Sequence, residues 1–314
     1  MPVEVEIIEG KTYTIDLNFM GIHGAIASYM IPHTGGVVLV ESGPGSTIPA
    51  LQAGLETYGF SVSDVSDVLL THIHLDHAGA AGWLADQGAT IYVHPIGAPH
   101  MRDPQKLLAS AARIYGDQMD QLWGEFLAVP ADRLIIPEDK DIIEINGLRF
   151  QALDTPGHAR HHIAYLYKDV CFSGDIGGVR MSGTKHLRIP MPPPEFVLED
   201  WRASQKRLQT EFVRGKFSRI APTHFGVFKD PIWHLNALQS GLDDVEAWIE
   251  SVMTEDLSIE KLNDEFLEWT HKRAIAEGFT QEQIDAYEAA NPSWMSSYGI
   301  QRYWKKYRWQ DQES

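Results

Sequence analysis

The stretch Thr71-His72-Ile73-His74-Leu75-Asp76-His77 decides how the rest of the chain is interpreted. It follows the apolar run at residues 68–70, a pattern typical of a buried strand that ends in a loop. His72 and His74 are two positions apart, so in extended backbone they point to the same side and can bind one cation together. Asp76 and His77 come after the chain turns and can face a second cation. Imidazole and carboxylate donors suit zinc, iron or manganese.

Three further predicted strand ends carry donors for such cations. They are Thr155-Pro156-Gly157-His158, Ser173-Gly174-Asp175 and Ala221-Pro222-Thr223-His224. Each signal is weak alone, because loops at strand ends often carry histidine or aspartate. Together with the first cluster, however, they place all the donors at the same structural position, the rim of a sheet.

With these four clusters the chain resembles the metallo-β-lactamase superfamily, to which glyoxalase II, the lactonases and the persulfide dioxygenases belong. The resemblance extends from the N-terminal strands to His224, and its His-x-His-x-Asp-His motif is complete at residues 72–77. It implies an α+β fold, namely an αββα sandwich of two facing sheets with helices outside. The pattern from Pro231 onward is helical only. We therefore expect a catalytic domain at residues 1–230 and a helical C-terminal extension at residues 231–314.

The resemblance also implies a dinuclear metal site. The first ion would be held by His72, His74 and His158, the second by Asp76, His77 and His224, and both by Asp175 as a bridge. The cofactor is then two divalent metal ions, with zinc favoured and iron or manganese as alternatives. Two such ions activate water as hydroxide near neutral pH and polarise the substrate. Asp76 is the candidate catalytic residue, because its carboxylate can orient the hydroxide or relay a proton.

Differences between this sequence and individual members of the superfamily narrow the range of reactions that we expect. Aspartate at position 175, where true zinc β-lactamases have cysteine, argues against that activity. No tyrosine lies between Asp175 and His224, which argues against an acyl-homoserine lactonase. The basic pattern that contacts glutathione in glyoxalase II is not found. We expect a hydrolase of a small ester, thioester or lactone. The alternative is a mononuclear iron enzyme of the persulfide dioxygenase type, which would use His72, His158 and Asp175.

Several neighbours of these residues are candidates for orienting them. A second shell of this kind fixes the tautomers of ligating histidines, and its candidates here are Thr71, Thr223, His161 and His162. Glu41 stands where the superfamily usually has aspartate, and we expect it to affect turn structure rather than metal binding. His186 and Arg188 follow Asp175 in a loop that we expect to border the pocket.

Two segments outside the predicted sandwich differ from it in their sequence pattern. Residues 96–135 carry apolar side chains at helical spacing, and an excursion of this length is either a functional lid or an amphipathic helix on the outside of the sheet. The tail beyond Pro231 is rich in tryptophan and tyrosine. These aromatic residues pack onto the main domain, onto a second subunit in a homodimer, or around the pocket. We expect both segments to wall the pocket and select the substrate.

Composition limits the classes of partner. The chain has 314 residues, 44% of them hydrophobic, and a net charge of −17, which disfavours nucleic acid and acidic membranes. Its one cysteine, Cys171, excludes an intrachain disulfide. No signal peptide and no run long enough to span a bilayer are present. We expect a cytoplasmic protein that acts on a small-molecule substrate.

Overall fold

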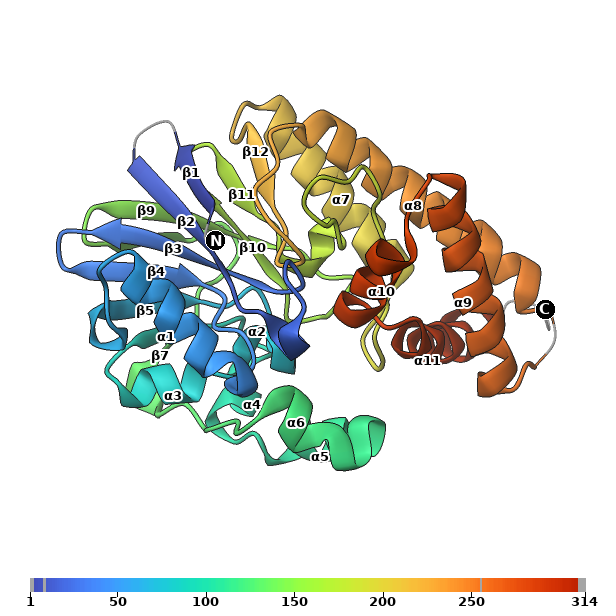
Figure 1. The fold of residues 1–314 in the computed structure, drawn as a ribbon, viewed down its shortest axis with the longest axis horizontal. Coiled ribbons are helices and arrows are strands. Elements are labelled where there is room, and N and C mark those ends of the chain that lie inside the picture. The colour runs from blue at the N-terminus through green and yellow to red at the C-terminus, as the bar shows by residue number, and fades with distance from the viewer. Residues whose placement is uncertain (1–2, 8–9, 255, 310–314) are drawn as a thin grey trace.

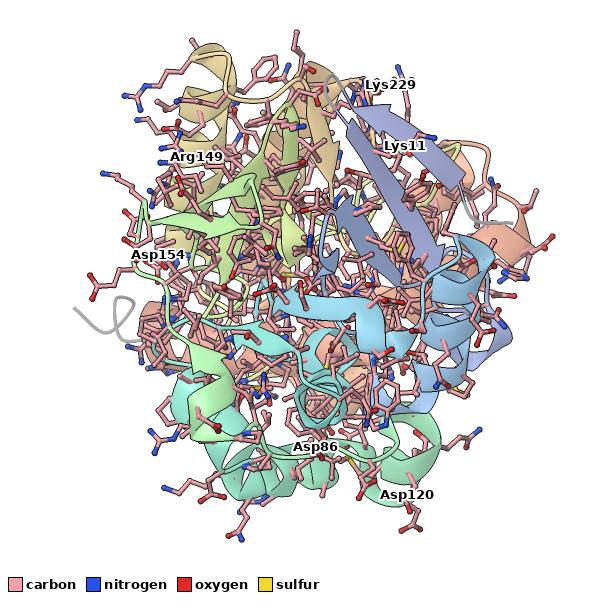
Figure 2. The ribbon with its side chains drawn as sticks, turned by 90° about the vertical axis from the view of Figure 1, so that its left-hand side faces the viewer. Lys11, Asp86, Asp120, Arg149, Asp154 and Lys229 are labelled. Carbon is pink, nitrogen blue, oxygen red and sulfur yellow. The ribbon has the colours of Figure 1, made fainter. Side chains whose placement is uncertain are left out.

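The computed structural model describes residues 3–7, 10–254 and 256–309. Two β-sheets lie face to face, and helices cover the outer face of each sheet (Figure 1). Charged side chains such as Asp86, Asp120 and Arg149 project outward from the molecule (Figure 2). The architecture is therefore the αββα sandwich that the sequence predicted.

In the described part of the chain, the first sheet has seven strands and the second has five. The first sheet consists in spatial order of β1 (Val3–Ile7), β2 (Gly10–Asp16), β3 (Ala27–His33), β4 (Gly36–Val40), β5 (Val65–Leu69), β6 (Thr90–Tyr92) and β7 (Leu134–Ile135). The second consists of β12 (Arg219–Ala221), β11 (Val170–Phe172), β10 (Ile163–Tyr167), β9 (Leu148–Asp154) and β8 (Ile142–Ile145). Strands β1 to β4 pair antiparallel, whereas β4 to β7 pair parallel.

Alternation of side chains along the central strands builds the layers. In β4, Val37 and Leu39 pack toward the helices, whereas Val38 and Val40 pack between the two sheets. Successive side chains in a strand point to opposite faces, so a strand buried on both faces is apolar throughout. Residues from the two sheets, among them Tyr29 and Tyr165, meet in the central core.

Helices of very different length lie between the strands or follow the last strand. On the side of the first sheet they are α1 (Ile48–Thr57), α2 (Leu75–Ala78), α3 (Ala81–Asp86), α4 (Ala98–Arg102), α5 (Gln105–Tyr115) and α6 (Met119–Trp123). On the side of the second they are α7 (Leu198–Val213), α8 (Pro231–Val252), α9 (Ile259–Ala276), α10 (Gln281–Ala290) and α11 (Ser293–Tyr303). The segment predicted as a lid or an amphipathic helix is thus three short helices, α4 to α6. No helix among the described residues is long and apolar enough to cross a membrane.

The C-terminal helices share a hydrophobic core with the second sheet. Leu166 of β10 and Trp201 of α7 belong to the same buried cluster as Leu238 of α8, Phe266 of α9 and Ile300 of α11. Because burial of apolar surface is the main stabilising contribution to folding, this shared core fixes the position of the extension against the sandwich. The division at Pro231 coincides with the start of α8, and its status as a domain boundary stays a prediction.

Candidate metal centre

Four strand ends bring the candidate ligands to one rim of the sandwich. His72 follows β5, His158 follows β9, Asp175 follows β11 and His224 follows β12. The chain turns at His74, which precedes the first turn of α2, so that Asp76 and His77 lie on that helix. The predicted residues, which come from positions far apart in the sequence, therefore meet at one place.

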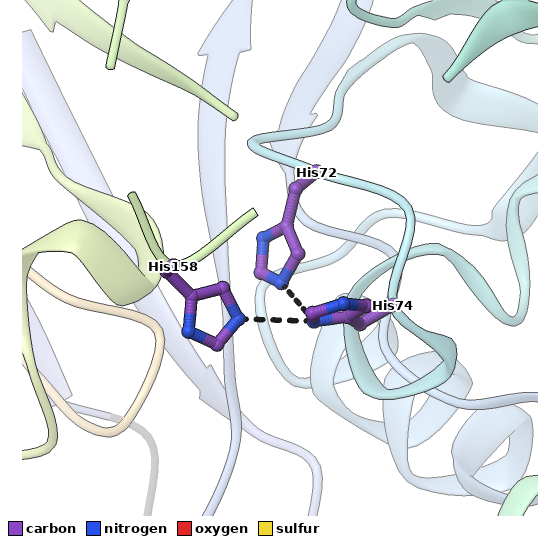
Figure 3. A group of neighbouring side chains, drawn as sticks. All are labelled: His72, His74 and His158. Atoms are coloured by element: carbon purple, nitrogen blue, oxygen red, sulfur yellow. Dashed lines mark hydrogen bonds between the residues drawn. The ribbon is translucent and has the colours of Figure 1, made fainter. Parts of the chain in front are cut away.

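A first group of donors consists of three histidines (Figure 3). Nε2 of His72 and Nε2 of His158 each lie 2.9 Å from Nδ1 of His74. His158 donates from Nδ1 to the carbonyl oxygen of Pro190 at 2.9 Å, so the lone pair of its Nε2 points toward the other two rings. Burial lowers the pKa of His72 and of His74, and the neighbouring imidazoles lower them further. Neutral imidazoles that converge in this way are suited to bind a cation.

A second group consists of Asp76, His77 and His224, whose donor atoms lie within 4.8 Å of one another. Oδ2 of Asp76 is 3.4 Å from Nε2 of His77 and 3.4 Å from Nε2 of His224. His224 donates from Nδ1 to the carbonyl oxygen of Ala25 at 2.7 Å. Its Nε2 lone pair therefore also faces carboxylate oxygens, an arrangement that a cation between them would stabilise.

Asp175 lies between the two groups. Its Oδ2 is 3.4 Å from Nε2 of His158, whereas its Oδ1 is 3.4 Å from Nε2 of His77 and 3.5 Å from Nε2 of His224. Burial opposes ionisation, but His77 and His224 hold the pKa of Asp175 below its ordinary value. Neither Oδ1 of Asp175 nor Nε2 of His77 has a hydrogen-bond partner among the described residues. Buried polar atoms without partners are costly, and this pair fits a cation that would satisfy both.

The loop that carries Asp175 depends on a glycine. Gly174 has φ +51°, and a Cβ at this position would lie 2.5 Å from the hydroxyl of Thr71 and 2.6 Å from Nε2 of His162. Any larger residue would push Asp175 away from the histidines. The small residue before Asp175 thus allows its carboxylate to approach the histidines closely.

Glu41 has a larger role than its position in the sequence predicted. Its φ of +70° does belong to a turn, but its side chain is fully buried. Oε1 accepts hydrogen bonds from Nδ1 of His77 at 3.0 Å and from the hydroxyl of Thr223 at 2.9 Å. The hydroxyl of Thr71 also donates to Oε1. Glu41 therefore orients a candidate ligand, and the expectation that it affects only the turn is wrong. The signal in the sequence was a carboxylate directly after an apolar strand.

The other predicted neighbours occupy distinct positions. The oxygen of Thr71 lies 3.1 Å from Nδ1 of His72. Because the Thr71 hydroxyl donates to Glu41, this oxygen accepts from His72 and directs the Nε2 lone pair of His72 inward. His162 contacts Thr155 at 2.8 Å and accepts from the backbone N–H of Ile176, so it supports the loop that holds Asp175.

His161 has a different partner and lines the cavity above the candidate ligands. Its Nδ1 accepts from the backbone N–H of Ile73, and its Nε2 lies 3.0 Å from Oε2 of Glu195. Glu195 was not predicted from the sequence, because no local pattern connects it to His161. Both residues line the cavity described next.

A cavity of about 550 Å³ opens above the candidate ligands. His74, Asp76, His158, Asp175 and His224 form its floor. Helices α5 and α6 line one wall, and residues 289–292 and 294–296, at the junction of α10 and α11, line another. The prediction that these two segments wall the pocket is confirmed.

His186 and Arg188 lie outside this cavity. His186 contacts Glu277 at 2.8 Å, and Arg188 contacts Glu288 at 2.6 Å. Both are buried against the C-terminal helices. The expectation that they border the pocket is wrong, because the loop turns away to tie the extension to the sandwich.

Comparison with known proteins identifies the family. The family model described as "Metallo-beta-lactamase superfamily" matches residues 22–224, more than half of the chain. The chain belongs to this superfamily. The matched region ends at His224, the last of the candidate ligands in the sequence.

Named relatives align over parts of the chain. A metallo-beta-lactamase fold-containing protein from Sulfurisphaera tokodaii is 31% identical over 47% of this chain and 58% of its own length. A hydroxyacylglutathione hydrolase from Xylella fastidiosa strain 9a5c is 30% identical over 64% of this chain and 63% of its own. The chain thus covers less than two thirds of the length of these relatives.

Solved structures share the fold over nearly the whole chain. An archaeal metallo-beta-lactamase superfamily protein from Sulfolobus tokodaii has a TM-score of 0.60 at 19% identity and covers 94% of this chain and 99% of its own. A metallo-beta-lactamase family protein from Thermus thermophilus has a TM-score of 0.57 at 19% identity and covers 98% of this chain and 93% of its own. At this identity the similarity establishes the fold alone.

Proposed function

We propose that this chain is a dinuclear metal-dependent hydrolase of a small ester, thioester or lactone. Membership of the superfamily and the hydrolase names of several relatives support a metal-dependent hydrolase. The observation that carries the dinuclear assignment is the placement of Asp175, whose two oxygens face two separate groups of nitrogen donors. When bound, two divalent ions supply a hydroxide nucleophile at neutral pH and polarise the carbonyl that it attacks.

The residues have separate roles in this proposal. His72, His74 and His158 would hold one ion, and His77 and His224 would hold the other together with Asp76, while Asp175 would contact both. Asp76 lines the cavity within the second group of donors, so in this proposal its carboxylate orients the nucleophile or relays a proton. Zinc suits the imidazole and carboxylate donors, and iron and manganese suit them as well.

Metal analysis tests the dinuclear assignment. Protein purified without added metal and then incubated with zinc or manganese should hold two ions per chain by elemental analysis. Asp175→Asn should lose the second ion, held by Asp76, His77 and His224, more readily than the first, because a neutral amide bridges two cations poorly. At most one ion per chain after incubation would contradict the proposal.

Oxygen dependence separates the hydrolase from the persulfide dioxygenase alternative. Panels of thioesters, esters and lactones should be assayed without oxygen, and oxygen uptake should be followed separately with glutathione persulfide. Anaerobic turnover that is lost in His224→Ala supports the hydrolase, because His224 belongs to the second group of donors. Iron-dependent oxygen uptake that survives His224→Ala, with no hydrolysis of any panel member, would favour the dioxygenase.

A further inference from the structure

The walls of the cavity above the candidate metal centre are predominantly apolar. On one side, α5 and α6 contribute Leu107, Ala111, Tyr115 and Trp123. The ring of Tyr115 packs against that of Trp123 with centroids 4.9 Å apart. Such a surface binds apolar groups because their transfer from water is favourable.

The C-terminal helices complete this wall from the opposite side. Trp294 of α11 packs edge-on against Tyr115, with ring centroids 5.8 Å apart, and the hydroxyl of Tyr115 lies 3.9 Å from the sulfur of Met295. Figure 1 shows α5 and α6 approaching the rim of the sandwich from one direction and α10 and α11 from another. The two segments thus enclose an apolar chamber of about 550 Å³, within the range of pockets that bind small molecules.

The charged side chains that line the cavity disfavour an anionic ligand. Among the described lining residues, the carboxylates are Asp76, Asp175 and Glu195, and the one Lys or Arg side chain is Lys106, which is exposed. Glu195 accepts from His161 and from the backbone N–H of Arg160, and these bonds hold its pKa at about 2 against the effect of burial. Along the walls, a carboxylate of a ligand would meet the ionised Glu195 and no Lys or Arg other than the exposed Lys106 among the described residues, and burial of an unpaired charge is costly.

We infer that the substrate carries, on one side of its scissile bond, an uncharged alkyl or aryl group that fills this chamber. The inference rests on the proposed hydrolase function and specifies its substrate class. It separates this chain from the hydroxyacylglutathione hydrolases to which it is similar, because the carboxylates of glutathione have no buried Lys or Arg to pair with among the described lining residues.

Binding of unreactive probes tests the chamber without catalysis. The probes are N-methyl amides of the straight-chain acids from butanoic to octanoic, titrated calorimetrically into protein without added metal. Affinity should rise about fourfold per added methylene, the gain expected from burial of each methylene. Affinity that does not depend on chain length would overturn the inference.

Turnover with the metal-loaded protein provides the second measurement. One series of thioesters lengthens the acyl group, a second lengthens the thiol, and lactoylglutathione is the charged comparison. An increase of kcat/KM with length in either series supports the inference. Faster turnover of lactoylglutathione than of every apolar thioester would overturn it. If the amides bind with the expected increments and no thioester is hydrolysed, the proposed reaction fails and the inference about the chamber stands.

A matched pair of variants on α5 tests whether the amides bind against this wall of the chamber. Ala111 lines the chamber and is buried, whereas Ala112, the next residue, is exposed and does not line it. Ala111→Asp should weaken binding of the octanoic amide by more than about tenfold, because a charge must be desolvated. Ala112→Asp should leave it unchanged. If Ala111→Asp does not fold, Ile114→Asp on the same wall replaces it, and unchanged binding by that variant would overturn the inference.

Discussion

The floor and the walls of the cavity are built in opposite ways. The floor consists of polar side chains, several of them oriented by specific hydrogen bonds such as those from His158 to Pro190 and from His224 to Ala25. The walls consist of apolar side chains on short helices, which meet through ring contacts such as that between Tyr115 and Trp294. Under the proposed function the floor provides reactivity and the walls provide selection, so changes to the two should have separable effects.

The largest effect is expected from removal of a floor ligand. His158→Ala deletes one of three converging nitrogens, so activity should fall by at least about 10³-fold as the ion that activates the nucleophile is lost. Metal content by elemental analysis should fall with it. His271→Ala, outside the candidate ligands and partly exposed, is the control and should keep both. Full activity in His158→Ala would contradict the role in catalysis that is assigned to the floor residues.

A change behind the floor should have a smaller effect. Glu41→Gln places an amide where one carboxylate oxygen accepts from His77, Thr71 and Thr223. Loss of such an orienting partner lowers metal affinity or activity by about 10- to 100-fold. Competition with a chromogenic chelator measures the affinity, and Glu56→Gln on the exposed face of α1 is the matched control. An unchanged affinity would mean that His77 does not need Glu41.

A change where the wall helix α11 packs against the rest of the protein should affect stability rather than catalysis. A Cβ on Gly299 of α11 would lie 1.9 Å from the carbonyl oxygen of Met191. Glycine to alanine inside an exposed helix stabilises it by about 1 kcal/mol, but this clash should reverse the sign. Gly299→Ala should lower the free energy of unfolding by about 1–3 kcal/mol.

Urea denaturation measures this effect, and Tyr298→Ala serves as a control on the same helix because Tyr298 is 47% exposed. Metal content should not change in either variant. Stabilisation by Gly299→Ala would show that α11 is free to move away from residue 191.

The smallest effect is expected on the outer face of the C-terminal helices. Nζ of Lys261 and Oε1 of Glu265 lie 3.9 Å apart on α9, and their side chains are 58% and 38% exposed. Such a pair, with the lysine first along the helix, contributes less than about 0.5 kcal/mol. Lys261→Ala should therefore leave the urea midpoint and the substrate profile unchanged. A shift in substrate profile would show that selection is not confined to the walls.

The sequence by itself determined the central motif and the layers. Alternating or continuous apolar runs end in short loops that carry His72, His158, Asp175 and His224, and local periodicity is sufficient to locate such strands. The hydrogen-bond partners of the candidate ligands could not be located in this way. Glu41 is 30 positions from Thr71 and 182 from Thr223, and no local pattern predicts a hydrogen bond across such separations.

Only the tertiary structure decided what the two segments outside the sandwich do. Their helical spacing fits an outer helix as well as a lid, because a periodic apolar face shows that a helix is buried but not against what. The folded chain brings Tyr115 and Trp294, which are 179 positions apart in the sequence, into contact above the candidate metal centre. It also turns the loop with His186 and Arg188 toward Glu277 and Glu288 and away from the cavity. Contacts between distant segments depend on how the layers pack, and that information is not present in any short stretch of sequence.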